Sequence, residues 1–87
     1  MITRKKILLE IKKIYKYIED YPDKSSILGP VTSAIIKLHM DLNFLHHEDR
    51  DEIASEIYKL KEYKKEKLKL AMQIEEKKYK ILKANKK

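Results

Sequence analysis

The histidines and acidic residues near the middle of the chain form its tightest group of potential metal ligands. His46, His47, Glu48 and Asp49 are consecutive, and His39 lies seven residues before His46. A metal site needs three or four donors that converge, whereas neighbours such as His46 and His47 point in different directions from a helix. We therefore interpret this group as a solvent-exposed corner with helix-capping acids, and expect no metal site.

Residue types that could support catalysis are present but lack the necessary arrangement. Nucleophilic catalysis needs a hydroxyl beside a base that a third group orients, and no such constellation surrounds the serines. The serines are Ser25, Ser26, Ser33 and Ser55. Asp41 and Glu48 could pair only in a cleft, for which a small helical chain leaves little room. Gly29 is the only glycine, so no phosphate-binding loop can form. The sequence predicts no catalytic residue, no cofactor and no small-molecule substrate.

The chemistry that the sequence favours is the binding of negative charge. The last 29 residues contain twelve lysines and four glutamates, whereas the first 58 contain nine basic and ten acidic residues. The formal net charge of +7 therefore comes from this lysine-rich arm, residues 59–87. Its lysines could neutralise backbone phosphates and release counterions. The candidate contacts are Lys59, Lys61, Lys65, Lys69, Lys77, Lys80 and Lys83. The alternative is that these lysines form the solvated exterior of a coiled coil.

The composition sets limits on the kind of protein. At 87 residues the chain has room for one domain, 1–87, and its small core favours help from self-association. Hydrophobic residues make up 43% and charged residues 40%, which elongated helices satisfy better than disorder or a compact globule. The absence of cysteine excludes disulfides and fits a reducing cytoplasm. The first apolar run ends at Leu9, so we expect neither a signal sequence nor a membrane span.

Two apolar stripes of similar length predict a pair of helices. The first helix is expected over about residues 3–21, before Pro22. Its stripe consists of Ile7, Ile11, Ile14, Ile18 and Tyr21. The second helix is expected over about 28–46, after a turn at 22–26. Its stripe consists of Leu28, Val31, Ile35, Leu38, Leu42 and Leu45. The two helices can pack as an antiparallel hairpin.

A third, longer helix is expected over about residues 50–84, where no glycine or proline interrupts the chain. Asp49 is predicted as its N-cap and Glu52 as the capping-box partner. At up to about 54 Å it is about twice as long as its companions and must extend beyond them. The residues expected to pack on the hairpin are Ile53, Ile57 and Leu60. On the same face Lys64 and Lys67 follow, so the internal core is expected to end there. A helix break in this region is the alternative.

Beyond Leu60 the apolar residues of the third helix form two narrow stripes separated by charge. One consists of Leu68, Ala71, Met72, Tyr79 and Leu82, and the other of Leu70, Ile74 and Ile81. The stripes lie roughly 140° apart around the helix. The hairpin is too short to cover them. We therefore expect them to contact a second copy, most simply in a symmetric dimer, or a macromolecular partner.

The sequence thus predicts an all-α protein that is oligomeric through its third helix, and it leaves three functions open. The first is non-specific binding of nucleic-acid backbone, which suits nineteen lysines and two arginines because base-edge recognition usually uses arginine. The second is a protein-interaction module that docks through the apolar stripe, such as an inhibitor, adaptor or immunity-type protein of a mobile element. The third is a structural or assembly protein.

Overall fold

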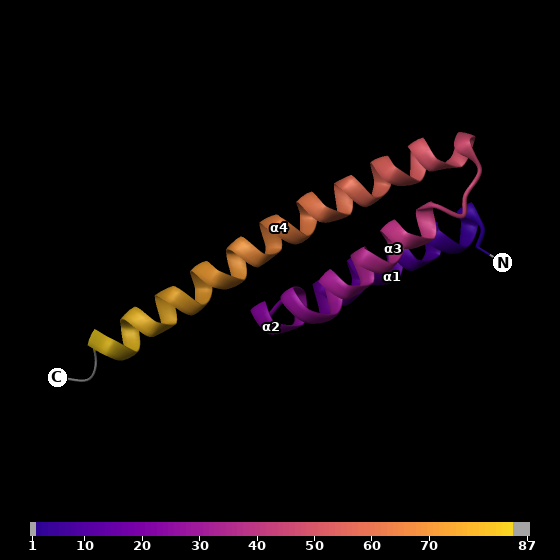
Figure 1. The fold of residues 1–87 in the computed structure, drawn as a ribbon. Helices are drawn as coiled ribbons and strands as arrows, with labels where there is room; N and C mark the ends of the chain where they lie inside the picture. Colours follow the sequence, from indigo (N-terminus) through magenta and orange to yellow (C-terminus); the bar gives the residue numbers. More distant parts are fainter. Residues whose placement is uncertain (1, 85–87) are drawn as a thin grey trace.

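The computed structural model contains three helical rods and, over residues 2–84, no strand. The structure describes the backbone of residues 2–84 and the side chains of residues 2–78 and 80. Its elements are α1 (Arg4–Asp20), α2 (Lys24–Ser26), η1 (Ile27–Val31), α3 (Thr32–Leu42) and α4 (His47–Ala84). α2, η1 and α3 join into one helix antiparallel to α1, and α4 lies along this pair (Figure 1). The predicted all-α arrangement of a hairpin followed by a long helix is confirmed.

α1 forms where its apolar stripe was predicted, with both ends one residue inside the expected bounds. The Thr3 hydroxyl accepts a hydrogen bond from the Lys6 backbone N–H at 3.2 Å, so Thr3 caps the helix. The isoleucines of the stripe are buried: Ile7, Ile11, Ile14 and Ile18. Tyr21, expected to continue the stripe, is instead 54% exposed because the helix ends at Asp20, ahead of Pro22.

The second helix begins at Lys24, four residues before its expected start. Asp23 supplies the cap, because its carboxylate accepts hydrogen bonds from the Ser26 backbone N–H at 3.1 Å and the Ser25 hydroxyl at 2.7 Å. Residues 24–26 of the segment expected to form a turn therefore form the first helical turn, whereas Pro22 and Asp23 lie outside the helix. A short polar segment with a good N-cap was mistaken for a loop.

Pro30 lies inside the second helix. There η1 widens into a π turn, an arrangement that accommodates a residue without a backbone N–H. The earlier start also changes the apolar stripe, since Ile27 is fully buried whereas the predicted Leu28 is 44% exposed. The remaining predicted positions are buried or partly buried: Val31, Ile35, Leu38, Leu42 and Leu45.

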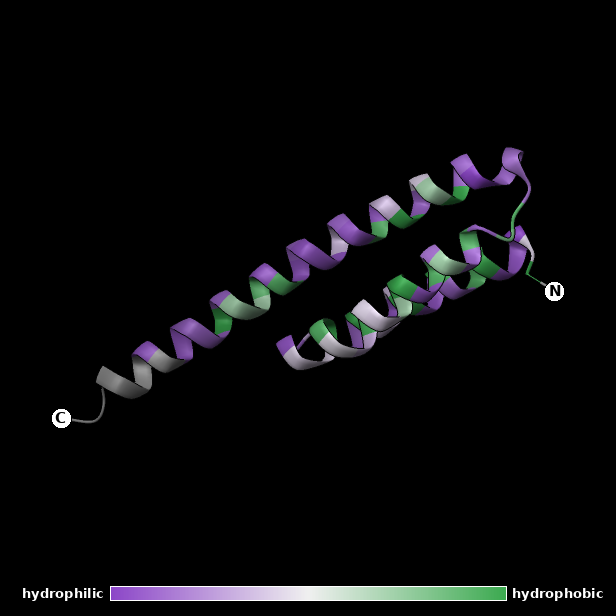
Figure 2. Cartoon of the chain, viewed as in Figure 1, coloured by the Kyte–Doolittle hydropathy of each residue, from purple (hydrophilic) through white to green (hydrophobic). Residues whose placement is uncertain are grey.

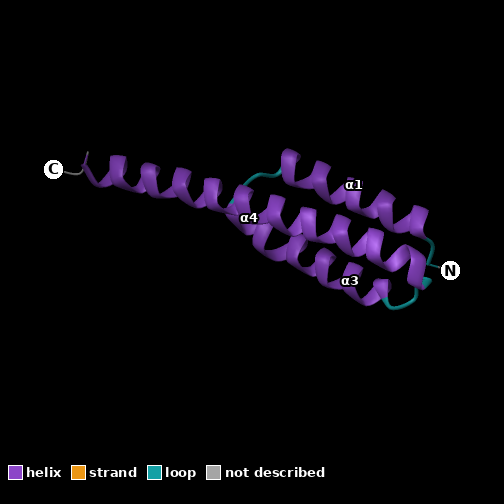
Figure 3. Cartoon of the chain, turned by 90° about the horizontal axis from the view of Figure 1, so that it is seen from above, coloured by secondary structure: helices purple, strands orange, loops and turns teal. Residues whose placement is uncertain are grey.

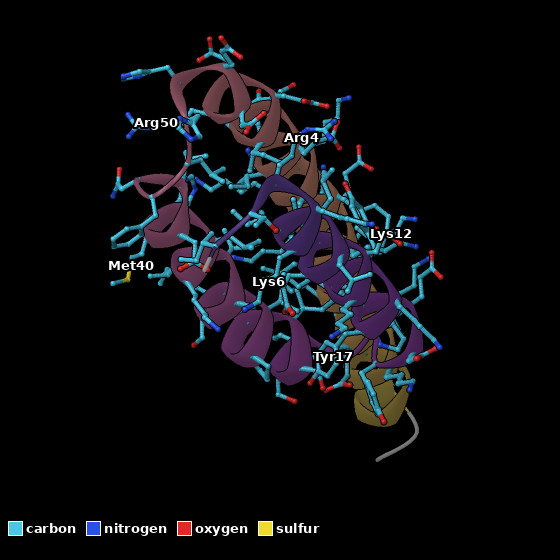
Figure 4. All side chains as sticks on the ribbon, turned by 90° about the vertical axis from the view of Figure 1, so that its right-hand side faces the viewer. Arg4, Lys6, Lys12, Tyr17, Met40 and Arg50 are labelled. Carbon is cyan, nitrogen blue, oxygen red and sulfur yellow. The ribbon has the colours of Figure 1, made fainter. Side chains whose placement is uncertain are left out.

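A tight turn ends the second helix at Leu42, four residues before its expected end. The Arg50 side chain holds this turn, with Nε donating to the Leu45 carbonyl and Nη2 to the Asn43 carbonyl, each at 3.0 Å. Arg50 lies beside the connection between α3 and α4 (Figure 4). Leu45 is buried although it lies outside the helix, so the turn itself contributes to the core.

α4 begins at His47, three residues before its expected start. The His46 carbonyl accepts the Asp49 backbone N–H at 3.0 Å, so Asp49 lies in the first turn and its prediction as N-cap is wrong. Its carboxylate is still near the positive end of the helix dipole. Glu52, predicted as the capping-box partner, instead accepts hydrogen bonds from the Arg4 guanidinium, with Nε at 2.7 Å. A contact with α1 therefore replaces the predicted local one.

The hydrophobic core follows the line where the three rods meet (Figure 2). The α4 residues predicted to enter it are fully buried: Ile53, Ile57 and Leu60. The core continues further than predicted, since Ala71 is only 7% exposed and Tyr63 and Leu68 pack against the buried residues. The rings of Tyr15 and Tyr63, with centroids 4.9 Å apart, join α1 to α4. The lysines at 64 and 67 are partly buried and do not interrupt this packing.

α4 is continuous through residues 64–67, so the alternative with a break there is wrong. It contains 38 residues and is about 57 Å long, compared with about 26 Å for the 17 residues of α1. The far end of α4 extends beyond the hairpin and the molecule measures 62 × 18 × 17 Å (Figure 3). Among the described residues, no helix is both long and apolar enough to cross a membrane.

Candidate nucleic-acid and partner interfaces

The part of α4 that follows its last buried residue is exposed wherever its side chains are described. We define the distal segment as residues 72–84, which follow Ala71, the last buried residue of α4. Every described side chain in this segment is exposed. No other described element lies alongside the far end of the segment (Figures 1 and 3). The described side chains of the segment are therefore accessible to a partner.

The predicted lysine contacts are exposed but do not lie on one line. The exposed members are Lys59, Lys61, Lys65, Lys69, Lys77 and Lys80, whereas Lys83 lies outside the described side chains. At roughly 100° per residue, they occupy the outward face and both flanks of α4. The structure thus brings these lysines onto one rod without forming a single basic stripe.

Two of these lysines lie beside glutamates of the same helix. Lys59 Nζ is 3.3 Å from Glu56 Oε1, and Lys80 Nζ is 3.5 Å from Glu76 Oε1. Exposed pairs of this kind are weak and are screened by salt. The other four exposed candidates form no ion pair with any described carboxylate. Most of the positive charge of α4 is therefore available to an external anion.

The two arginines serve the fold and not the lysine-rich surface. Arg4 joins α1 to Glu52 of α4, and Arg50 holds the turn before α4. The hydrogen bonds between Arg4 and Glu52, together with their opposite charges, raise the pKa of Arg4 and lower that of Glu52. Lysine point charges alone are thus left for an anionic partner. They suit phosphate contacts better than bidentate recognition of base edges.

The two predicted apolar stripes lie on opposite flanks of α4, with one exception. Leu68 is partly buried and Met72 is 48% exposed on the α3 side, whereas Leu70 and Ile74, on the opposite flank, are 51% and 54% exposed. Ala71 is buried within its own chain, so its assignment to a partner interface is wrong. The predicted residues that lie outside the described side chains are Tyr79, Ile81 and Leu82.

The flank that carries Leu70 and Ile74 borders an open hollow beside the end of the hairpin. This hollow has a volume of about 410 Å³ and is also lined by Pro22 and Ala71. Charged residues of both signs surround it: Asp23, Lys24, Lys67, Glu75 and Lys78. Its mixed charge does not favour one sign of partner.

The histidine and acidic residues do not converge on a metal site. Among the residues that the structure describes, no group of three or more potential ligands could hold a metal ion. His46 and His47 are exposed at the turn before α4. His39 lies on α3, where partial burial and, to a smaller extent, the Lys61 charge lower its pKa.

The first two serines contribute to a helix cap and not to a nucleophilic site. The hydroxyl groups of Ser25 and Ser26 donate to the Asp23 carboxylate at 2.7 and 2.9 Å. These hydrogen bonds lower the pKa of Asp23. The group therefore stabilises the start of the second helix.

Sequence reasoning missed an exposed apolar row on α3 and the turn that follows it. Ile36 is 56% exposed, Met40 62% and Phe44 73%. Met40 projects away from the core (Figure 4). The spacing of four residues between these side chains could have indicated the row. Only the longer apolar stripe of the same helix, which is buried, was used to predict contacts.

No protein-family model, curated protein or solved structure matches this chain. The geometry described above is therefore the only basis for proposing a function.

Proposed function

We propose that this protein is non-catalytic and binds nucleic-acid backbone non-specifically through the lysines of α4. The observation that supports this proposal is the distal segment, a basic helix whose described side chains are all exposed beyond the hairpin. A bare α-helix is about 10–12 Å wide with its side chains, close to the width of the major groove of duplex DNA. Lysines on several sides of such a helix can reach phosphates on both walls of the groove.

A homodimer strengthens this proposal, because two weakly bound helices on one nucleic acid act together. Leu70 and Ile74, exposed on one flank of the distal half of α4, are the proposed dimer contacts. The absence of cysteine agrees with a location in the reducing cytoplasm, which we also propose.

The salt dependence of binding tests the proposal. A labelled duplex of about 20 base pairs should bind at about 50 mM salt, with an affinity that falls steeply as salt rises. Each lysine–phosphate contact contributes about −0.9 to the slope of log K against log salt, so Lys77→Ala with Lys80→Ala should reduce the slope by about 1.8. Single-stranded DNA is measured in parallel.

A matched control separates location from net charge. Lys12 and Lys16 are exposed on α1, so their double replacement by alanine removes the same charge at a distance from the distal segment. The proposal expects this control to leave the slope unchanged. Absence of binding at about 50 mM salt, or an equal change in both double variants, contradicts it.

A second candidate function is a protein-interaction module, which the exposed apolar side chains of α4 favour. Met72, Leu70 and Ile74 are each about half exposed on a helix that is otherwise strongly charged. Backbone phosphates would not cover them. Replacement of Leu68 and Met72 by glutamate should abolish capture of one specific protein and leave the hairpin folded, and wild-type capture by that variant contradicts the module.

A further inference from the structure

An open trough lies on the flank between α3 and α4. The hollow nearer the start of α4 has a volume of about 370 Å³ and is lined by Thr32, Ile35, Ile36, His39, Lys61, Lys64, Lys65 and Leu68. A second hollow of about 440 Å³ is lined by Lys65, Leu68, Lys69, Met72, Gln73 and Glu76. Lys65 and Leu68 line both hollows, so the hollows adjoin each other along α4, and the surface that they form together from Lys61 to Glu76 is called the trough. This stretch is about 22 Å long, which is about four helical turns.

The floor of the trough is apolar and only partly covered by its own chain. Ile36 is 56% exposed and Met72 48% exposed, with the partly buried Leu68 between them along the trough. Such a strip of aliphatic and methionine side chains is typical of a groove that receives the apolar face of a helix.

The rim of the trough has one sign of charge over most of its length. Its lysines are Lys61, Lys64, Lys65 and Lys69. Among the described lining residues, the only carboxylate is Glu76, at the distal end. An occupant with an apolar face bordered by acidic residues would therefore match the trough in both respects.

Charge complementarity distinguishes among the possible occupants. A second copy that used the same trough in a two-fold dimer would place these four lysines against themselves. A nucleic acid would satisfy the lysines but leave Ile36 and Met72 exposed.

We propose that the trough binds an acidic amphipathic helix of another protein, about four turns long, whose apolar side chains pack on Ile36, Leu68 and Met72. This proposal rests on the protein-interaction function, and the trough shares Lys61, Lys65 and Lys69 with the proposed phosphate contacts.

A synthetic peptide of defined pattern tests the proposal directly. The probe is a labelled peptide of about 15 residues with leucine at i, i+4, i+7 and i+11 and glutamate or alanine elsewhere. Its fluorescence anisotropy should rise saturably with the full-length protein. A peptide of the same composition with a scrambled order, which keeps the charge but loses the apolar face, should bind about tenfold more weakly or worse.

Matched variants of the protein locate the binding surface. Ile36→Glu in the trough should weaken binding by about tenfold or more, because it removes an apolar contact and adds a like charge. Leu9→Glu is the control, since Leu9 is 55% exposed on α1, away from the trough. Met72→Glu provides a second trough variant, and circular dichroism establishes that each variant is folded.

Each of the following outcomes would overturn the proposal. Equal binding of the ordered and scrambled peptides would show attraction by charge alone, and equal losses in Ile36→Glu and Leu9→Glu would place the peptide elsewhere. Dissociation of a dimer by Ile36→Glu would make a second copy the occupant. Weaker oligonucleotide binding by Ile36→Ala, which leaves the net charge unchanged, would make the trough a nucleic-acid surface. Because Lys77 and Lys80 do not line the trough, failure of the phosphate-binding test does not affect the peptide test.

Discussion

Replacement of one buried and one exposed isoleucine by alanine measures how firmly α4 packs on the hairpin. Ile57 of α4 is 0% exposed and Ile36 of α3 is 56% exposed. Ile57→Ala leaves a cavity in the core and should cost about 2–5 kcal/mol of unfolding free energy. A domain of 87 residues has only about 4–13 kcal/mol in total. Ile36→Ala removes atoms that are largely in water and introduces a better helix former, so its effect should stay within about 0.5 kcal/mol.

Urea unfolding followed by far-ultraviolet circular dichroism separates the two variants. With an m value of about 1–2 kcal/mol per molar urea, Ile57→Ala should lower the midpoint by about 1 M or more. Ile36→Ala should leave it within about 0.5 M of the parent. An unchanged midpoint for Ile57→Ala would refute the packing of α4 on the hairpin. Equal losses in both variants would show that the α3 flank is covered in solution.

Three further predictions follow from particular contacts. Hydrogen bonds from Arg4 lower the pKa of Glu52, so wild type should be more stable than Glu52→Gln above the ordinary pKa of glutamate and should lose this advantage as pH falls through the lowered pKa of Glu52. Urea midpoints of both proteins across the acidic range test this. A difference between the two midpoints that does not change with pH contradicts it. Asp23→Ala should lower the unfolding midpoint and Asp23→Asn should retain most of it, since asparagine also caps helices; equal losses would remove the capping role. Light scattering should report a dimer that Leu70→Glu with Ile74→Glu converts to a monomer, and a monomeric parent would exclude this interface.

Much of the fold was predictable because it depends on regular apolar spacing. The isoleucines of α1 and the α4 residues Ile53 and Ile57 are buried as predicted, since a 3-4 repeat places them on one side of a helix. The errors lie at helix ends, where one side-chain contact decides the outcome. Asp23 caps the second helix four residues before its predicted start. Glu52 accepts hydrogen bonds from Arg4 in place of the predicted local cap at the start of α4. Such contacts depend on tertiary neighbours and have no clear periodic signal.

The candidate surfaces were predictable only in part. Charge counting identified the lysine-rich helix, because the excess is concentrated in one segment. It could not show that Ala71 is buried while Met72 is half exposed, since that difference depends on where the hairpin ends relative to α4. The trough between α3 and α4 was missed for a related reason. Its floor combines Ile36 with Leu68, residues that come together only when two separate helices are packed side by side.

Because α4 runs unbroken from the packed region into the distal segment, the packing of its first part fixes the rotational phase of residues 72–84. One residue inserted just beyond Ala71 would turn every later side chain by about 100° and move it by about 1.5 Å along the axis. An insertion of seven residues, about two turns, would restore the phase to within about 20°. A change of length at this point therefore changes the direction of all the described lysine and apolar side chains of the distal segment relative to the hairpin.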